Sequence, residues 1–178
     1  MPRLAFTTFG VLIEPSNHPQ SKGFVDRIEE TYAEAEGCEG FIDRSVRDIK
    51  TWTHSWGEQV CPNFLDPALA AQIAQTVTIW DDLESVFAYS YTGFHAEGLK
   101  MRKEWFREPE YPNYAAWWVA DDHQPTFAEA TQKLEMLHAQ GSTPESFSFK
   151  KPFDTQGNPA VLDQAVAKEK MKRNAALR

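Results

Sequence analysis

The sequence has few cysteines and no long hydrophobic run. Cys38 and Cys61 are its two cysteines, and neither belongs to a CxxC pair or to a zinc-like spacing with histidine. Isolated thiols are typical of a reducing compartment. No stretch approaches the roughly 18 apolar residues of a membrane-spanning helix. The N-terminal residues 1–17 lack the apolar core of a signal peptide. These absences predict a cytoplasmic protein.

Positive charge is also scarce, because 18 Lys and Arg face 26 Asp and Glu, for a net charge of -8. A general nucleic-acid binder needs a basic surface to displace counterions, and an anionic membrane attracts the same kind of surface. We therefore expect neither partner. One basic cluster lies near the C-terminus, and we interpret it as the exposed face of a helix: Lys168, Lys170, Lys172, Arg173 and Arg178.

The five histidines show no HxH, HxxxH or HExxH spacing. The sequence therefore predicts no metal site and no cofactor. A haem with a single axial histidine leaves no sequence pattern, so a haem protein stays open as an alternative.

The chain is rich in aromatic side chains, with six Trp and twelve Phe among 178 residues. Its length fits one domain, and a hydrophobic share of 42% is enough for a core. Aromatic rings serve cores, ligand pockets and interfaces alike.

Hydrophobic periodicity predicts four strands and three main helices. The strands are expected at 4–13, 40–49, 76–80 and 114–120, and the helices at 25–36, 83–106 with a break near Gly93, and 127–140. The order β-α-β-β-α-β, followed by extra C-terminal helices, predicts an α+β fold of the ferredoxin-like type.

An antiparallel sheet with helices on one face leaves its other face to be covered. A second copy of the sheet would cover it, forming a dimeric α/β barrel around a cavity. We expect this domain to span residues 1–153. Residues 154–178 are expected to form a mobile C-terminal helical tail.

Two local patterns are specific. Thr126 and Glu129 match a capping box at the start of the last main helix, and His123 is expected to pin the preceding turn by a hydrogen bond. Trp117 and Trp118 are neighbours in a predicted strand, so they should point to opposite faces of the sheet.

The connection at 50–69 is long for a compact domain. Trp52, His54 and Trp56 alternate in it, and an extended backbone would place the three side chains on one side. They could close over a ligand as a lid, or cover the core, or meet a partner subunit.

Residues 76–153 carry a combination of short motifs: His-Ala-Glu at 95–97, Glu-Trp-Phe at 104–106, Trp-Trp-Val at 117–119 and His-x-Pro-Thr at 123–126. This part resembles a family of uncharacterised-function domains of the dimeric α/β-barrel superfamily, which also contains the antibiotic-biosynthesis monooxygenases. The N-terminal half matches loosely, and the 50–69 segment is longer than the family pattern. The resemblance implies a homodimer better than it implies a reaction, because function depends on the site.

His95 is the first catalytic candidate. It shares an apolar helical row with Leu99 and Phe106, where an imidazole can act as a general acid or base. A structural histidine bonded to the backbone is the alternative. Tyr91 lies four residues earlier and would share its face if the helix were continuous. We expect the substrate-binding wall to come from aromatic residues that could instead be core or interface: Trp52, His54, Trp56, Trp80, Trp105 and Trp118.

These residues favour a small-molecule enzyme that acts on an aromatic or polyketide-like substrate by acid–base chemistry. A cyclase, an isomerase or a cofactor-independent monooxygenase of a secondary-metabolite-like pathway would fit. The alternatives are a non-catalytic ligand-binding dimer and a haem-binding enzyme of the same fold. A cavity into which neither His95 nor Tyr91 points would favour the binding protein.

Overall fold

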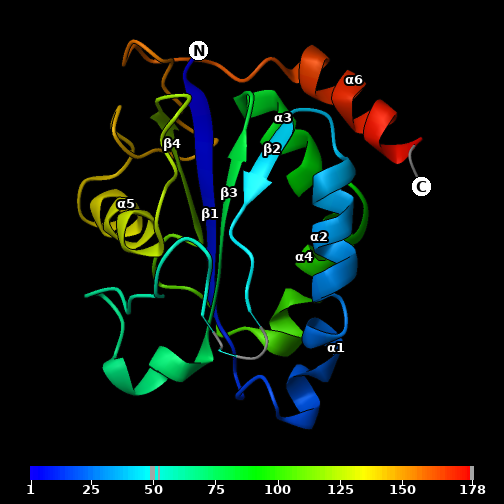
Figure 1. The fold of residues 1–178 in the computed structure, drawn as a ribbon, viewed down its shortest axis with the longest axis vertical. Coiled ribbons are helices and arrows are strands. Elements are labelled where there is room, and N and C mark those ends of the chain that lie inside the picture. The colour runs from blue at the N-terminus through cyan, green and yellow to red at the C-terminus, as the bar shows by residue number, and fades with distance from the viewer. Residues whose placement is uncertain (49–50, 52, 177–178) are drawn as a thin grey trace.

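The computed structural model describes residues 1–48, 51 and 53–176. It is an α+β protein built on one four-stranded antiparallel sheet (Figure 1). The strands are β1 Arg3–Val11, β2 Phe41–Arg44, β3 Ile73–Trp80 and β4 Tyr114–Val119, in the order β2-β3-β1-β4. The central strand β1 pairs with β3 on one side and β4 on the other, so that Leu4 lies opposite Trp80 and Trp118.

Six α-helices and two 3-10 helices complete the described chain. The α-helices are α1 Lys22–Val25, α2 Ile28–Gly37, α3 Leu83–Ser90, α4 Gly93–Trp105, α5 Phe127–Gln140 and α6 Gln164–Ala175. The 3-10 helices are η1 Pro19–Ser21 and η2 Pro67–Gln72. The predicted break in the 83–106 region is confirmed: Gly93 has a φ of 60°, a backbone conformation that favours glycine.

The second strand is much shorter than predicted. After Arg44 and Ser45 the backbone leaves β3 and bonds to the following segment, with Ser55 N donating to Val46 O at 2.8 Å and Asp48 N donating to Thr53 O at 2.8 Å. The sequence pattern could not show whether this stretch pairs with β3 or with the segment that follows it, because both pairings use extended backbone.

Both faces of the sheet are covered within one chain. In Figure 1 the sheet is seen nearly edge-on, with α5 and the 53–72 connection on one side and α1, α2 and α4 on the other. The helical side buries Leu4 and Trp80, each 0% exposed, and the opposite side buries Val77 and Trp117 at 1% and 2% exposed. The expectation of an open face that a second copy would cover was therefore wrong. Strand β1 is buried on both faces along most of its length, as strands in three-layer folds are.

The start of α5 confirms the predicted cap and turn. The Thr126 hydroxyl accepts a hydrogen bond from Glu129 N at 3.1 Å. The Glu129 carboxylate does not reach back to the cap but accepts from Trp117 Nε1 at 2.8 Å and from His123 Nε2 at 2.7 Å. Trp118 points to the other face of the sheet, as predicted, and its Nε1 donates to Phe153 O at 2.7 Å.

The C-terminal segment contributes to the packed body. Phe147 pairs with Ala116 beside β4, and α6 packs on α3. Lys170 of α6 is only 7% exposed, and its Nζ donates to Asp82 Oδ2 at 2.9 Å and to Ser85 Oγ at 2.7 Å. Burial alone would raise the pKa of Asp82, but hydrogen bonds from Lys170 and Ser85 outweigh it and hold that pKa below its usual value. The segment expected as a mobile C-terminal helical tail is thus linked to α3 and its cap by a partly buried ion pair.

Candidate functional site

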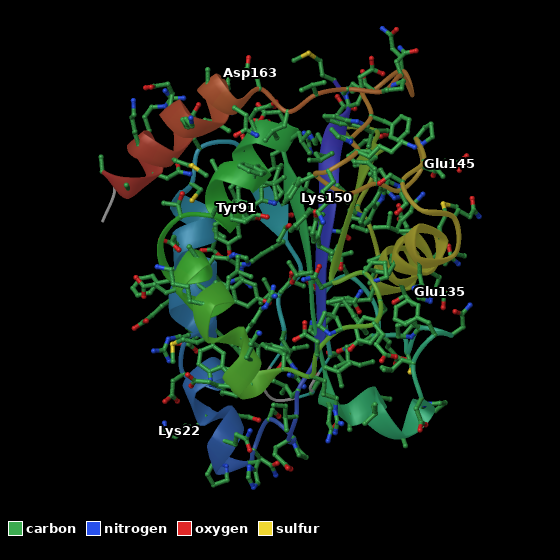
Figure 2. The ribbon with its side chains drawn as sticks, turned by 180° about the vertical axis from the view of Figure 1, so that it is seen from behind. Lys22, Tyr91, Glu135, Glu145, Lys150 and Asp163 are labelled. Atoms are coloured by element: carbon green, nitrogen blue, oxygen red, sulfur yellow. The ribbon has the colours of Figure 1, made fainter. Side chains whose placement is uncertain are left out.

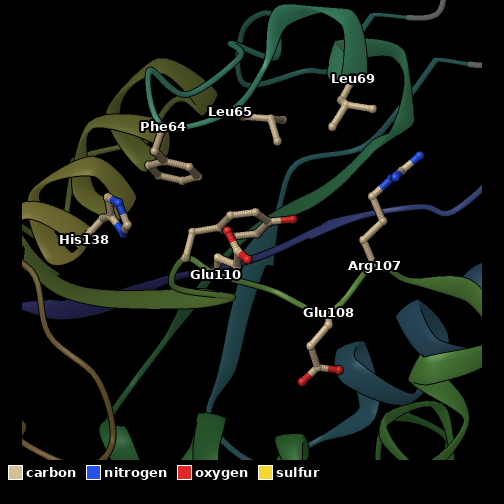
Figure 3. Close-up of a pocket in the computed structure, with 8 residues that line it drawn as sticks. Phe64, Leu65, Leu69, Arg107, Glu108, Glu110 and His138 are labelled. Atoms are coloured by element: carbon tan, nitrogen blue, oxygen red, sulfur yellow. The ribbon is translucent and has the colours of Figure 1, made fainter.

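A cleft with aromatic walls opens on the side of the sheet that α5 covers. It encloses about 340 Å³ between the 64–69 segment, the 107–111 loop and the end of α5 (Figure 3). Its lining combines aromatic, aliphatic and charged side chains: Phe64, Leu65, Leu69, Arg107, Glu108, Glu110, Tyr111 and His138.

Stacked rings form the wall of this cleft, which we call the aromatic cleft. Phe64 and Tyr111 lie nearly parallel, with centroids 5.2 Å apart and an interplanar angle of 19°. Phe9 of β1 is buried behind them and meets both rings edge-on, at 5.8 Å and 5.3 Å. His138 completes the wall, 5.0 Å from Phe64. Aromatic pairs prefer offset-stacked and edge-on contacts such as these.

Strand β1 fixes the loop that carries Arg107 and Tyr111. Arg107 N donates to Val11 O at 2.9 Å, and Phe9 N donates to Asn113 O at 2.8 Å. Gly10 lets the Phe106 ring lie on the strand, because a Cβ at this position would come within 2.7 Å of that ring. The loop is therefore held by β1, one of the two inner strands of the sheet.

The segment at 60–65, which carries Phe64, is anchored to α5. Asn63 N donates to Glu135 Oε1 at 2.6 Å, and the Thr131 hydroxyl donates to Val60 O at 3.2 Å. Leu65 is buried in the cluster that contains Leu134 and Leu137 of the same helix. Both segments are thus preformed, as is usual for small-molecule sites.

Polar groups of both signs lie around the aromatic wall. The Arg107 Nη2 donates to Ile13 O at 3.3 Å and to Gln72 Oε1 at 3.4 Å. Burial raises the pKa of Tyr111 above its usual value, and the Arg107 guanidinium offsets part of this rise. The Tyr111 phenol is therefore protonated at neutral pH, when its hydroxyl can donate a hydrogen bond.

His95 has a structural environment and lines neither this cleft nor the second cavity described below. Its Nδ1 lies 2.8 Å from Ser90 O, and its ring is 4.9 Å from Tyr89. Burial lowers the pKa of His95, although the Ser90 carbonyl and the charge of Glu34 act in the opposite direction. A neutral imidazole that donates from Nδ1 to a carbonyl matches the structural alternative considered for this residue.

Tyr91 is separated from His95 by the break at Gly93. Its side chain is 49% exposed, and its ring contacts Phe87 at 4.6 Å, whereas His95 packs on Tyr89. Figure 2 shows Tyr91 beside the α3–α4 junction, away from Glu135 of α5 on the other side of the sheet. The shared face expected for a continuous helix therefore does not form.

The other aromatic candidates pack into the fold. Trp56, Trp80 and Trp105 are 4%, 0% and 4% exposed. The half-buried Trp118 bonds to Phe153 O, and the His54 ring lies 4.3 Å from Phe127. None of these five lines the aromatic cleft, and Trp52 lies outside the described residues. Within the connection that could form a lid, Trp56 and Leu65 are core residues, so the described chain at these two positions packs on the fold.

A second cavity of about 430 Å³ lies between α2, α4 and α6. Its lining is Glu30, Ala33, Glu34, Gly37, Cys38, Phe94 and Asn174. It comes near the backbone of His95, because Glu34 Oε2 accepts from His95 N at 3.4 Å. Phe94 is the one aromatic residue in this lining, so the cavity offers no stacked wall for a ligand.

Sequence reasoning missed the aromatic cleft. Phe64 stood in a connection without a clear period, and Arg107 and Tyr111 stand in a short loop between a helix and a strand. The signal that could have drawn attention is the Arg-Glu-Pro-Glu-Tyr-Pro stretch at 107–112, because prolines make a loop rigid.

Across the parts of the chain that the structure describes, no three His, Cys, Asp or Glu side chains gather closely enough to hold a metal ion. Over the same residues, no helix has both the length and the apolar character needed to cross a membrane.

Fold and cleft together define an α+β protein with a four-stranded antiparallel sheet covered on both faces and an aromatic surface cleft. The chain belongs to the family described as domain of unknown function DUF3291, whose model matches residues 3–163. The match includes the aromatic cleft and ends just before α6. Searches of curated proteins and of solved structures found no match.

Proposed function

We propose that this protein binds a small apolar or aromatic molecule in the aromatic cleft. The observation that carries the proposal is the parallel pair of Phe64 and Tyr111, supported by buried Phe9 and facing a hollow of about 340 Å³. Small-molecule sites commonly enclose about 300 to 1,000 Å³ and are lined mainly by apolar and aromatic groups. Rings already fixed by packing lose little freedom when a ligand binds. Neither His95 nor Tyr91 lines the cleft, which favours a binding protein over catalysis by those residues.

For the fold we propose the ferredoxin-like class. The element order β-α-β-β-α-β and the strand order β2-β3-β1-β4 support it. The binding proposal does not require a dimer, because all eight residues that line the cleft come from one chain.

The test is fluorescence titration of the full chain with 2-naphthol, a small neutral aromatic probe. Phe64→Ala removes one stacked ring and should weaken binding by about tenfold. The matched control is Phe87→Ala, which removes a half-buried ring on the helical side of the sheet and should leave the affinity unchanged. Circular dichroism checks that both variants are folded. Equal affinity of the wild type and Phe64→Ala would contradict the proposal.

A second candidate is the acid–base enzyme expected from the sequence, with a cyclase, an isomerase or a cofactor-independent monooxygenase as its reaction class. The observation that favours it is that the His138 imidazole and the Tyr111 hydroxyl line the same cleft, so His138 takes the role first given to His95. His138→Gln should abolish turnover of a substrate found by screening while 2-naphthol still binds. Full turnover in this variant would remove the role.

A further inference from the structure

The polar end of the aromatic cleft is built around Arg107. Its Nη2 donates to Ile13 O at 3.3 Å and to Gln72 Oε1 at 3.4 Å, and these bonds tether one nitrogen of the exposed guanidinium. A guanidinium carries five N–H donors in a planar fork that matches a carboxylate. Across the described chain no other hydrogen bond of this guanidinium is present, so Nε and Nη1 keep donors for a ligand.

The charge of Arg107 acts on the ring that forms the wall. It lowers the pKa of Tyr111 against the effect of burial, so the guanidinium is close enough to influence the phenol. Glu108 and Glu110 line the cleft as well, so the lining carries charges of both signs. Figure 3 shows Arg107 and Glu108 extending from the loop in opposite directions, with Arg107 on the side of Leu69. Arg107 therefore supplies positive charge on the side of the cleft that Leu69 lines.

We infer that the cleft takes a small organic carboxylate with an apolar or aromatic body. This inference rests on the proposed function and adds the chemical class of the ligand. The Arg107 guanidinium and the Tyr111 hydroxyl would donate to the carboxylate, while Phe64 and Leu69 contact the body. Hydrogen bonds between charged partners are roughly twice as strong as neutral ones, so the carboxylate should decide the preference among ligands of equal size.

The experiment is calorimetric titration of the full chain with three ligands of one shape and different charge: phenylacetate, neutral 2-phenylethanol and cationic 2-phenylethylamine. We expect phenylacetate to bind about tenfold tighter than 2-phenylethanol. Arg107→Met should abolish this preference, because the binding of phenylacetate should weaken by about tenfold. Tyr111→Phe should reduce the preference by a few-fold, because the carboxylate then loses the hydrogen bond from the Tyr111 hydroxyl.

The matched control is Arg102→Met, which removes an equal charge from an exposed position of α4 outside the cleft lining. It should keep the full preference. Tighter binding of 2-phenylethylamine would overturn the inference, because Glu108 and Glu110 would then dominate the site. A preference that survives Arg107→Met would also overturn it. Binding of all three ligands with equal affinity would overturn the carboxylate class alone, whereas binding of none would overturn the proposed function itself.

Discussion

The two sides of the sheet are covered by different kinds of structure, and they use their aromatic residues differently. On the helical side, Trp80 stacks on Tyr89 at 5.2 Å and His95 packs on the same tyrosine. On the other side, one helix and the irregular 53–72 connection cover the sheet. Phe64 and Tyr111 there stay partly exposed and line a cleft.

This difference between the two sides explains why most of the site residues predicted from the sequence pack within the fold and do not line a cleft. Regular helices bring their apolar rows into close contact with a sheet, so rings and imidazoles on those rows are used in packing. Connecting segments lie on the surface and carry a large share of binding residues, and here the 64–69 segment and the 107–111 loop leave a cleft between them. Substitutions on the helical side should therefore cost stability, whereas substitutions at the aromatic cleft should cost binding.

The largest effect is expected at Trp80. This side chain is 0% exposed, and its Nε1 donates to Thr78 Oγ1 at 2.9 Å. Trp80→Ala should lower the free energy of unfolding by about 3–5 kcal/mol, because it leaves a large cavity in the core. Urea denaturation measures this cost. A loss below about 1 kcal/mol would break the comparison, because the helical side would then not be tightly packed.

The next largest effect is expected at Lys170. Lys170→Met removes the donor to Asp82 and Ser85 and should cost about 1–2 kcal/mol at neutral pH, with water compensating in part at the 40% exposed Asp82 side chain.

This cost should depend on pH in a defined direction. The folded-state pKa of Asp82 lies below its unfolded value of about 3.9, so its contribution is complete above that value and is lost as the pH falls through the folded pKa. The wild type and Lys170→Met should therefore approach each other in stability below about pH 4, measured by urea unfolding at several pH values. A constant difference down to pH 2 would contradict the ion pair.

A smaller effect is expected from His95. Burial lowers its folded-state pKa below the unfolded value of about 6.5, so the unfolded chain binds more protons between the two values. Stability should be complete above pH 6.5 and should decrease as the pH falls through this window. His95→Gln should flatten the decrease, and an NMR titration of the His95 ring should show a midpoint below 6.5. His54, whose pKa burial also lowers, contributes in the same direction, so His54→Gln serves as the comparison variant.

The smallest effect is expected at Tyr91, which is 49% exposed and contacts Phe87. Tyr91→Ala should cost at most about 1 kcal/mol and leave the binding of 2-naphthol unchanged. Thermal unfolding and the same fluorescence titration measure both quantities. A loss of 2-naphthol binding in this variant would contradict the expected difference between the two sides, because it would place the ligand on the helical side.

Much of the fold could be predicted because its signals are local. The strands around Leu4 and Trp117, the break at Gly93 and the cap at Thr126 follow from periodicity and from backbone preferences of single residues. The aromatic cleft could not be predicted in this way. Phe64 and Tyr111 are far apart in the sequence, and they meet because each packs on Phe9 of a third segment.

The sequence by itself determined the α+β class, the alternation of strands and helices and the aromatic character of the core, because neighbouring residues decide these properties. Only the tertiary structure decided that both faces of the sheet are covered within one chain, and which segments cover each face. It also decided that His95 is bonded to the backbone carbonyl of Ser90 and that Arg107 lies beside a stacked pair of rings. These outcomes depend on which distant segments come into contact, and packing over the whole chain selects those contacts.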